Sequence, residues 1–338
     1  MDALRETDVR ADVLQGRRIA VIGYGSQGAA QAMNLRDSGL DVVVGLREGS
    51  ATRSRVAEAG LRMCGVAEAA RDADVVMLLI PDEVQPEVYE AEVGGALRRG
   101  AYLGFAHGFA IHFGRIAPSE DVNVFLVAPK GVGHMVRSQY EGGLGVPGLI
   151  AVHQDPSGNT RDVAAAYAGG LGCGRAGILE TTFREETETD LFGEQAVLCG
   201  GLSELIRAGY ETLVSAGYAP EMAYFECLHE VKLIADMIHE RGISGMRAAI
   251  SNTAEYGDLT RGRRVIGAGV REAMRQVLRE IQTGTFAEEW MAEHAAGRRQ
   301  MQELAGRDAE HPIEDVGRRL RRLMPWLEQR GGTPSAEG

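Results

Sequence analysis

The chain has 338 residues, of which 44% are hydrophobic and 25% are charged, a composition typical of globular proteins. This length predicts two domains, because single hydrophobic cores stop growing at roughly 250 residues. The net charge of −12 argues against a nucleic acid or an anionic membrane surface as a partner, since both carry negative charge themselves.

The cysteines show no CxxC pair and no histidine at zinc-finger spacing; they are Cys64, Cys173, Cys199 and Cys227. This pattern indicates reduced thiols in a reducing compartment. The charged N-terminal residues lack the apolar stretch of roughly 7–15 residues that a secretory signal needs. The longest apolar run, at residues 73–81, is far too short to span a bilayer. We therefore expect a cytoplasmic protein.

The first half of the chain alternates strand and helix patterns. Apolar runs predict strands at residues 18–23, 41–46, 74–80, 101–107, 122–127 and 148–153. Helical patterns at residues 26–38 and 50–59 are each followed by a glycine, Gly39 and Gly60. Continuous apolar strands separated by helices favour a parallel sheet covered on both faces. We predict an α/β Rossmann-type N-terminal domain over residues 1–181.

The second half has a different character. After about residue 180 the sequence has few β-branched runs and shows helical periodicity, for example at residues 194–208, 219–241 and 271–283. These patterns predict an all-α C-terminal domain over residues 182–328. Residues 329–338, with the sequence GGTPSAEG at their end, are expected to form a disordered tail.

Residues 23–28, with the sequence GYGSQG, match the GxGxxG pattern directly after the first predicted strand and at the start of a helix. In that context the first glycine permits a tight turn, the second lets a pyrophosphate approach the backbone, and the third packs helix against strand. The helix N-terminus then faces the phosphates. The motif predicts a dinucleotide-binding site.

The loop after the second predicted strand favours NADP over NAD. NAD sites usually carry an acidic residue here, to hold the ribose hydroxyls. In this chain Arg47 can meet a 2′-phosphate, and Ser50 and Thr52 can donate hydrogen bonds to it. Ser50 alternatively fits the N-cap position of the next helix. Glu48 complicates the prediction, because a carboxylate in this loop repels a phosphate.

Polar residues follow three of the predicted strands. Residues 81–85, PDEVQ, belong to a loop that lines the cofactor crevice in such sheets, although the spacing of Asp82 favours a simple helix cap. His107 and Lys130 each stand just after a strand. Both are therefore candidates for proton transfer.

Two carboxylate pairs lie in the helical half, Asp190 with Glu194 and Glu226 with Glu230. Residues four apart share one helix face, so each pair can direct two oxygen ligands at one point, which suits Mg²⁺ or Mn²⁺. The alternative is a solvated acidic face, which the apolar neighbours of both pairs disfavour. Three further acids lie in a more polar stretch and are expected to be solvated: Glu185, Glu186 and Glu188.

Several motifs occur in order along residues 14–328: GYGSQG, HGFAIHFG, APKGVGH, DLFGEQAVLCGG, FECLHEVKLI, AISNTAEYGD and EHPIEDVGRRLRRLMPWL. Together they resemble the ketol-acid reductoisomerase (acetohydroxyacid isomeroreductase) family, in its short bacterial class I form. The resemblance implies conversion of 2-acetolactate or 2-aceto-2-hydroxybutyrate into a 2,3-dihydroxy-3-methyl acid. An alkyl group migrates first, and NADPH then reduces the 2-keto acid, on the route to valine and isoleucine.

The resemblance also implies roles for individual residues. Two Mg²⁺ ions would be held by Asp190, which bridges them, with Glu194 at the first ion and Glu226 and Glu230 at the second. Ser251 would bind the substrate carboxylate, although its spacing alone favours a helix cap. His107 and Lys130 would be catalytic. The implied cofactor contacts are Tyr24, Gly25, Ser26, Gln27, Arg47, Ser50, Thr52, Asp82, Glu83, Val84, Gln85 and Gly133.

In the class I form the two carboxylate pairs come from different subunits whose helical domains intertwine, which implies an obligate homodimer that can assemble further. Departures from the family pattern at Arg241, Met246 and Arg247 leave open a paralogue that acts on a different 2-keto or acetohydroxy acid. Two other hypotheses are a metal-free 3-hydroxyacid dehydrogenase or imine reductase, and a non-enzymatic NADP-sensing module.

Overall fold

The computed structural model describes residues 3–324. It contains two compact units, Met1–Thr189 and Asp190–Gly338. The division falls within helix α8 (Phe183–Gly193), a few residues after the expected boundary between 181 and 182. The predicted tail at residues 329–338 lies outside the described residues.

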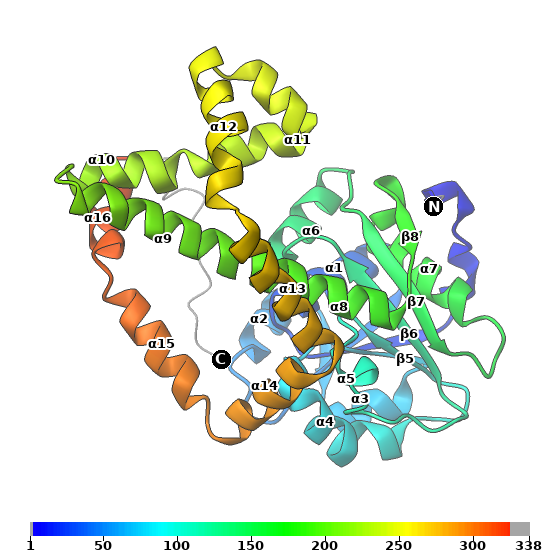
Figure 1. The fold of residues 1–338 in the computed structure, drawn as a ribbon. Helices are drawn as coiled ribbons and strands as arrows, with labels where there is room; N and C mark the ends of the chain where they lie inside the picture. Colours follow the sequence, from blue (N-terminus) through cyan, green and yellow to red (C-terminus); the bar gives the residue numbers. More distant parts are fainter. Residues whose placement is uncertain (1–2, 325–338) are drawn as a thin grey trace. The chain divides into compact units, whose positions relative to one another are not determined.

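The first unit contains an eight-stranded sheet in the order β3-β2-β1-β4-β5-β6-β7-β8 (Figure 1). The strands are β1 (Arg18–Ile22), β2 (Asp41–Gly45), β3 (Arg62–Cys64), β4 (Val75–Leu78), β5 (Tyr102–Phe105), β6 (Asn123–Pro129), β7 (Gly148–Gln154) and β8 (Ile178–Glu180). The order of the first six strands is that of a doubly wound dinucleotide-binding sheet, with a switch point between β1 and β4. The predicted Rossmann-type class is confirmed.

The prediction of a parallel sheet is wrong for one pair of strands. β7 pairs antiparallel with β6, from Pro129 opposite Gly148 to Val124 opposite Gln154. The reason is the connection: α6 packs against α1 and does not carry the chain back across the sheet, so β7 returns beside β6. Strands β3 and β8 were not predicted, because three-residue strands are too short to give a pattern.

The helices of the first unit are α1 (Ser26–Asp37), α2 (Arg53–Glu58), α3 (Val66–Asp72), α4 (Gln85–Val88), α5 (Phe109–His112), α6 (Gly133–Glu141) and α7 (Thr160–Gly170). The glycines that follow α1 and α2 have φ values of +80° at Gly39 and +68° at Gly60. Both therefore end their helices in the left-handed conformation that glycine favours, as the sequence predicts.

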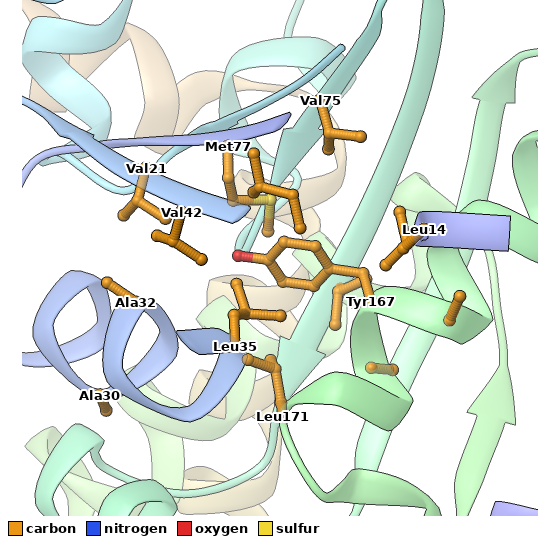
Figure 2. Close-up of a cluster of buried hydrophobic side chains, with 14 of the residues drawn as sticks. Leu14, Val21, Ala30, Ala32, Leu35, Val42, Val75, Met77, Tyr167 and Leu171 are labelled. Carbon is orange, nitrogen blue, oxygen red and sulfur yellow. The ribbon is translucent and has the colours of Figure 1, made fainter. Parts of the chain in front are cut away.

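Both faces of the sheet are buried. Along β1, Ile19 and Val21 join one apolar cluster, and Ala20 and Ile22 join a second cluster, because successive side chains of a strand point to opposite faces. Figure 2 shows the first cluster, in which Tyr167 of α7 lies among apolar side chains of the sheet and of α1. This packing holds the carboxyl ends of the strands, and the loops that follow them, in fixed positions.

Every element in the second unit, as far as residue 324, is helical, which confirms an all-α domain. The helices are α9 (Gly200–Ser215), α10 (Pro220–Tyr224), α11 (Val231–Ala249), α12 (Asn252–Val265), α13 (Ala268–Gln282), α14 (Thr285–Ala295), α15 (Arg299–Ala309) and α16 (Pro312–Arg321), with π-helical turns η7 (Glu194–Leu198) and η8 (Phe225–His229). Within residues 3–324 no helix has the length and apolar character that crossing a membrane requires.

Candidate active site

The glycine turn joins β1 to α1. Gly23 has a φ of +98°, and a Cβ atom there would lie 2.7 Å from the carbonyl oxygen of Leu79. A Cβ atom at Gly28 would lie 2.4 Å from the oxygen of Gly23, so the helix contacts the turn. A Cβ atom at Gly25 would meet nothing within 4 Å. The backbone at Gly25 is therefore accessible, as binding of a pyrophosphate at this helix N-terminus requires.

The loop after β2 carries one guanidinium and two hydroxyl groups. Arg47 is exposed, and the Oγ atom of Ser50 lies 3.0 Å from Oγ1 of Thr52. Helix α2 begins at Arg53 with Thr52 in the N-cap position, so Ser50 does not cap the helix. These groups are of the kinds that a 2′-phosphate site uses.

Asp82 and His107 form a hydrogen-bonded pair at the carboxyl edge of the sheet. The Oδ2 atom of Asp82 lies 2.6 Å from Nδ1 of His107, and Oδ1 of Asp82 accepts a 3.1 Å hydrogen bond from Nε2 of Gln85. Gln85 is buried. The prediction that Asp82 caps a helix is wrong: the 3₁₀ turn η3 (Asp82–Val84) starts at Asp82 itself, and Pro81 occupies its N-cap position. The Asp82 carboxylate instead orients the imidazole ring.

Lys130 follows β6 and contacts a buried carboxylate. Its Nζ donates a 3.2 Å hydrogen bond to Oε1 of Glu186, and Oε2 of Glu186 accepts the backbone N–H of Gly108 at 3.0 Å. The prediction that Glu186 is solvated is wrong, because only 1% of the residue is exposed. Its spacing was the available signal: Glu186 precedes Asp190 by four residues and so lies one helical turn before it.

Glu188 is also buried, contrary to the prediction. It accepts a 3.0 Å hydrogen bond from Nε of Arg184, and Nε2 of His112 lies 3.4 Å from it. Burial lowers the pKa of His112, and the Glu188 carboxylate opposes this effect. Glu185 is exposed as predicted, and it accepts a hydrogen bond from Thr181.

Helix α8 packs closely on the turn before α5. A Cβ atom at Gly108 would lie 2.2 Å from Oγ1 of Thr187, which leaves no room for a larger residue. The ring of Phe183 meets the ring of Phe105 edge-on, with centroids 6.3 Å apart. Contacts on two sides therefore fix the rotation of α8 about its axis.

The N-terminus of α6 lies against the glycine turn. A Cβ atom at Gly133 would lie 2.2 Å from the carbonyl oxygen of Ser26. The side chain of Gln27 donates a 2.9 Å hydrogen bond to the carbonyl oxygen of Gly131, and Tyr24 packs in the core. The loop that carries Lys130 is thus tied to the proposed cofactor loop.

The two carboxylate pairs lie at the π-helical turns of the second unit. Asp190 precedes η7, which Glu194 opens, and Glu226 lies in η8, which ends just before Glu230. Such turns are frequent at functional sites. Asp190 is half-buried and the other three acids are exposed. Among residues 3–324, no three His, Cys, Asp or Glu side chains gather closely enough to hold a metal ion.

Ser251 is the N-cap of α12, and its Oγ accepts the backbone N–H of Ala254 at 3.2 Å. The hydroxyl hydrogen can still be donated to a ligand. Nearby, the guanidinium of Arg247 donates to Asp258 at 2.5 Å and lowers the pKa of that carboxyl group. The charge of Arg247 is therefore paired with the Asp258 carboxylate. Met246 is buried.

A Rossmann-type sheet with these groups at its carboxyl edge, followed by a helical unit, defines a nucleotide-dependent oxidoreductase. Residues 13–177 match the family model described as acetohydroxy acid isomeroreductase, NADPH-binding domain, and residues 183–326 match ketol-acid reductoisomerase, C-terminal domain. The chain belongs to the ketol-acid reductoisomerase family.

Solved structures agree with this assignment. The chain is similar to an NADH-preferring ketol-acid reductoisomerase from an uncultured archaeon, with 47% identity, a TM-score of 0.93, and coverage of 96% of this chain and 99% of the other. Two more distant structures share the fold alone. One is an oxidoreductase from Jannaschia, with 17% identity, a TM-score of 0.59, and coverage of 79% of this chain and 98% of the other. The second is a semialdehyde dehydrogenase NAD-binding protein from Cupriavidus necator, with 20% identity, a TM-score of 0.55, and coverage of 78% of this chain and 100% of the other.

We expect Glu186→Gln to cut activity by about a hundredfold while the protein stays folded. The amide can still accept from Gly108, but it no longer offers Lys130 a carboxylate. Steady-state rates and thermal unfolding measure the two effects. Glu185→Gln, on the exposed side of the same helix, is the control and should behave as wild type. Equal activity in both variants would contradict the assigned contact.

We expect the unfolding free energy to fall as the pH decreases from 7 to 5. The pKa of His112 is lowered in the folded state, so the unfolded chain takes up a proton near pH 6.5 that the folded chain resists. His112→Gln keeps a donor for Glu188 and should flatten this dependence. Urea denaturation at both pH values measures it, and an unchanged slope in the variant would show that other groups cause the effect.

Proposed function

We propose that this chain is a cytoplasmic, NADPH- and Mg²⁺-dependent ketol-acid reductoisomerase that acts on 2-acetolactate or 2-aceto-2-hydroxybutyrate. The family match covers both units, and the family implies the valine and isoleucine pathway. The observation that supports the chemistry best is the contact between Lys130 and Glu186, because it joins a proton-transfer group to the helix that also carries Asp190.

His107 and Lys130 are the proposed proton-transfer residues. If the Nδ1–H of His107 is donated to Asp82, the neutral ring keeps Nε2 in the form that accepts a proton. Lys130 has its ammonium directed by Glu186, and we assign it to proton transfer near the migrating alkyl group. The hydroxyl of Ser251 and the N-terminus of α12 favour binding of the substrate carboxylate.

The acidic residues fit a site for hard cations, since carboxylate oxygens are the ligands that Mg²⁺ prefers. When bound, two Mg²⁺ ions would polarise the neighbouring oxygens of the substrate, and NADPH would supply the hydride. We assign Asp190 and Glu194 to one copy of the chain and Glu226 and Glu230 to the other. This division accounts for the exposure of three of the four acids in a single chain.

A homodimer would also cover the apolar surface of the helical unit. Its buried core among the described residues is small and includes Tyr210, Tyr224 and Val316. Many large apolar side chains of this unit are exposed, among them Val197, Leu198, Leu205, Leu233, Ile243, Tyr256, Leu259 and Leu304. Exposed apolar surface of this extent is typical of an interface, and a second copy supplies the matching helices.

Arg47, Ser50 and Thr52 support NADPH as the cofactor. The similar archaeal enzyme is described as NADH-preferring, so the preference is a property of the individual protein rather than of the fold. In this chain a guanidinium and two hydroxyls share the loop after β2, and Arg47 has Glu48 as its neighbour. The balance between these two charges sets the preference.

We expect Arg47→Ala to raise the KM for NADPH about tenfold and to leave the KM for NADH nearly unchanged, because only NADPH carries the 2′-phosphate. Glu48→Gln is the matched variant and should lower the KM for NADPH, because it removes a like charge from the loop. Initial rates with both cofactors measure the ratio. An equal change for NADH in the Arg47 variant would contradict a phosphate contact.

We expect NADPH consumption with 2-acetolactate that stops on treatment with EDTA and returns with Mg²⁺. Glu226→Gln should lower kcat by at least about a hundredfold, because one carboxylate ligand is lost. Turnover that survives complete metal removal would instead indicate a metal-free dehydrogenase. Binding of NADPH without turnover of any acetohydroxy or 2-keto acid would indicate a sensing module.

A further inference from the structure

A chain of hydrogen bonds runs from α7 through α1 to the loop after β6. The hydroxyl of Tyr167 donates to Oε1 of Gln31 at 2.9 Å. Nε2 of Gln31 donates to Oε1 of Gln27 at 3.1 Å. Nε2 of Gln27 then donates to the carbonyl oxygen of Gly131 at 2.9 Å. Each glutamine accepts through its oxygen and donates through its nitrogen, so all three hydrogen bonds are donated in the same direction, from Tyr167 toward Gly131.

Burial makes this direction hard to reverse. Tyr167 and Gln31 are fully buried, and Figure 2 shows the phenol ring enclosed by apolar side chains that include Ala32 and Leu35 of α1. Burial raises the pKa of the Tyr167 phenol, so the hydroxyl keeps its proton and remains a donor. If the Gln27 amide rotated by half a turn, its oxygen would face the Gly131 carbonyl oxygen, and this half-buried carbonyl would lose its hydrogen-bond donor.

The two ends of the chain belong to different parts of the proposed active site. Gln27 lies in the glycine turn that opens α1, and Gly131 directly follows Lys130. The close approach of Gly133 to the Ser26 carbonyl ties the same two segments a second time. A shift of the glycine turn is therefore transmitted to the peptide next to Lys130.

We propose that Gln31 and Tyr167 are positioning residues: they lock the Gln27 amide, which in turn holds Lys130 in register with the cofactor loop. This inference rests on the proposed function for the role of Lys130. Since Lys130 is assigned to the alkyl migration, loosening the chain should slow the migration more than the hydride step. Neither Gln31 nor Tyr167 needs to contact substrate or cofactor for this effect.

The test compares two reactions of each variant with saturating NADPH and Mg²⁺: complete conversion of 2-acetolactate, and direct reduction of 3-hydroxy-3-methyl-2-oxobutanoate, the 2-keto acid that the migration produces. We expect Gln31→Leu to lower kcat of the complete reaction by about tenfold to a hundredfold and that of the reduction by less than about threefold. Tyr167→Phe should also affect the complete reaction more than the reduction, with a smaller loss in kcat of the complete reaction, about fivefold to tenfold.

Two further variants separate positioning from general loss of stability. Gln31→His should restore most of the activity, because a neutral imidazole also offers one donor and one acceptor. Val163→Ala removes buried methyl groups from α7 but no member of the hydrogen-bond chain. Both reactions should therefore proceed at wild-type rates in this variant. A Gln31→Leu variant that slows both reactions equally, as a merely destabilised protein would, overturns the proposal.

Hydrogen–deuterium exchange over residues 130–136 gives a readout that does not depend on activity. We expect faster exchange there in Gln31→Leu and Tyr167→Phe than in Val163→Ala. Unchanged exchange in both variants overturns the positioning role, even if the wild-type protein converts 2-acetolactate. A wild-type protein that fails to convert 2-acetolactate refutes the proposed function instead. The exchange data then still decide whether the hydrogen-bond chain holds the loop after β6.

Discussion

The arrangement of the proposed proton-transfer residues in the first unit depends on the buried carboxylate of Glu186. One of its oxygens accepts from the Lys130 ammonium and the other from the Gly108 backbone. A carboxylate removed from water is costly unless it is paired and hydrogen-bonded, so α8 cannot rotate without leaving this charge unsatisfied. The tight contact between Gly108 and Thr187 restricts the same helix sterically. Lys130, the turn after His107 and the first turns of α8 thus form one rigid group.

The candidate groups that sequence analysis can find are those that local patterns specify. The glycine turn is local because its three glycines act within six residues, and the carboxylate pairs are local because they follow helical spacing. The roles of Asp82 and Glu186 were missed because they depend on partners far along the chain, His107 and Gly108. The antiparallel pairing of β7 with β6 was missed for the same reason: the packing of α6 against α1, which no local pattern encodes, decides the direction in which the chain returns.

Two features of the second unit bear on the proposed homodimer. Its helices bury a small core and leave wide apolar surfaces exposed, and its paired acids do not gather into a metal-holding cluster within residues 3–324. The proposed homodimer would account for both features, because a second copy would cover the apolar faces and bring the other pair of carboxylates to each site. In that proposal assembly and catalysis would have the same structural basis, because the surface of the dimer would also form the metal site.

The most direct test of this shared site mixes two inactive variants. Co-expressed Asp190→Asn and Glu226→Gln chains form mixed dimers in which one site has both substitutions and the other has neither. With random pairing, half of the dimers are mixed and about a quarter of all sites are intact. A site shared between two chains predicts about a quarter of wild-type turnover of 2-acetolactate from this mixture, although each variant alone is inactive. A mixture as inactive as its parents, with mixed dimers shown to be present, would contradict a site built from two chains.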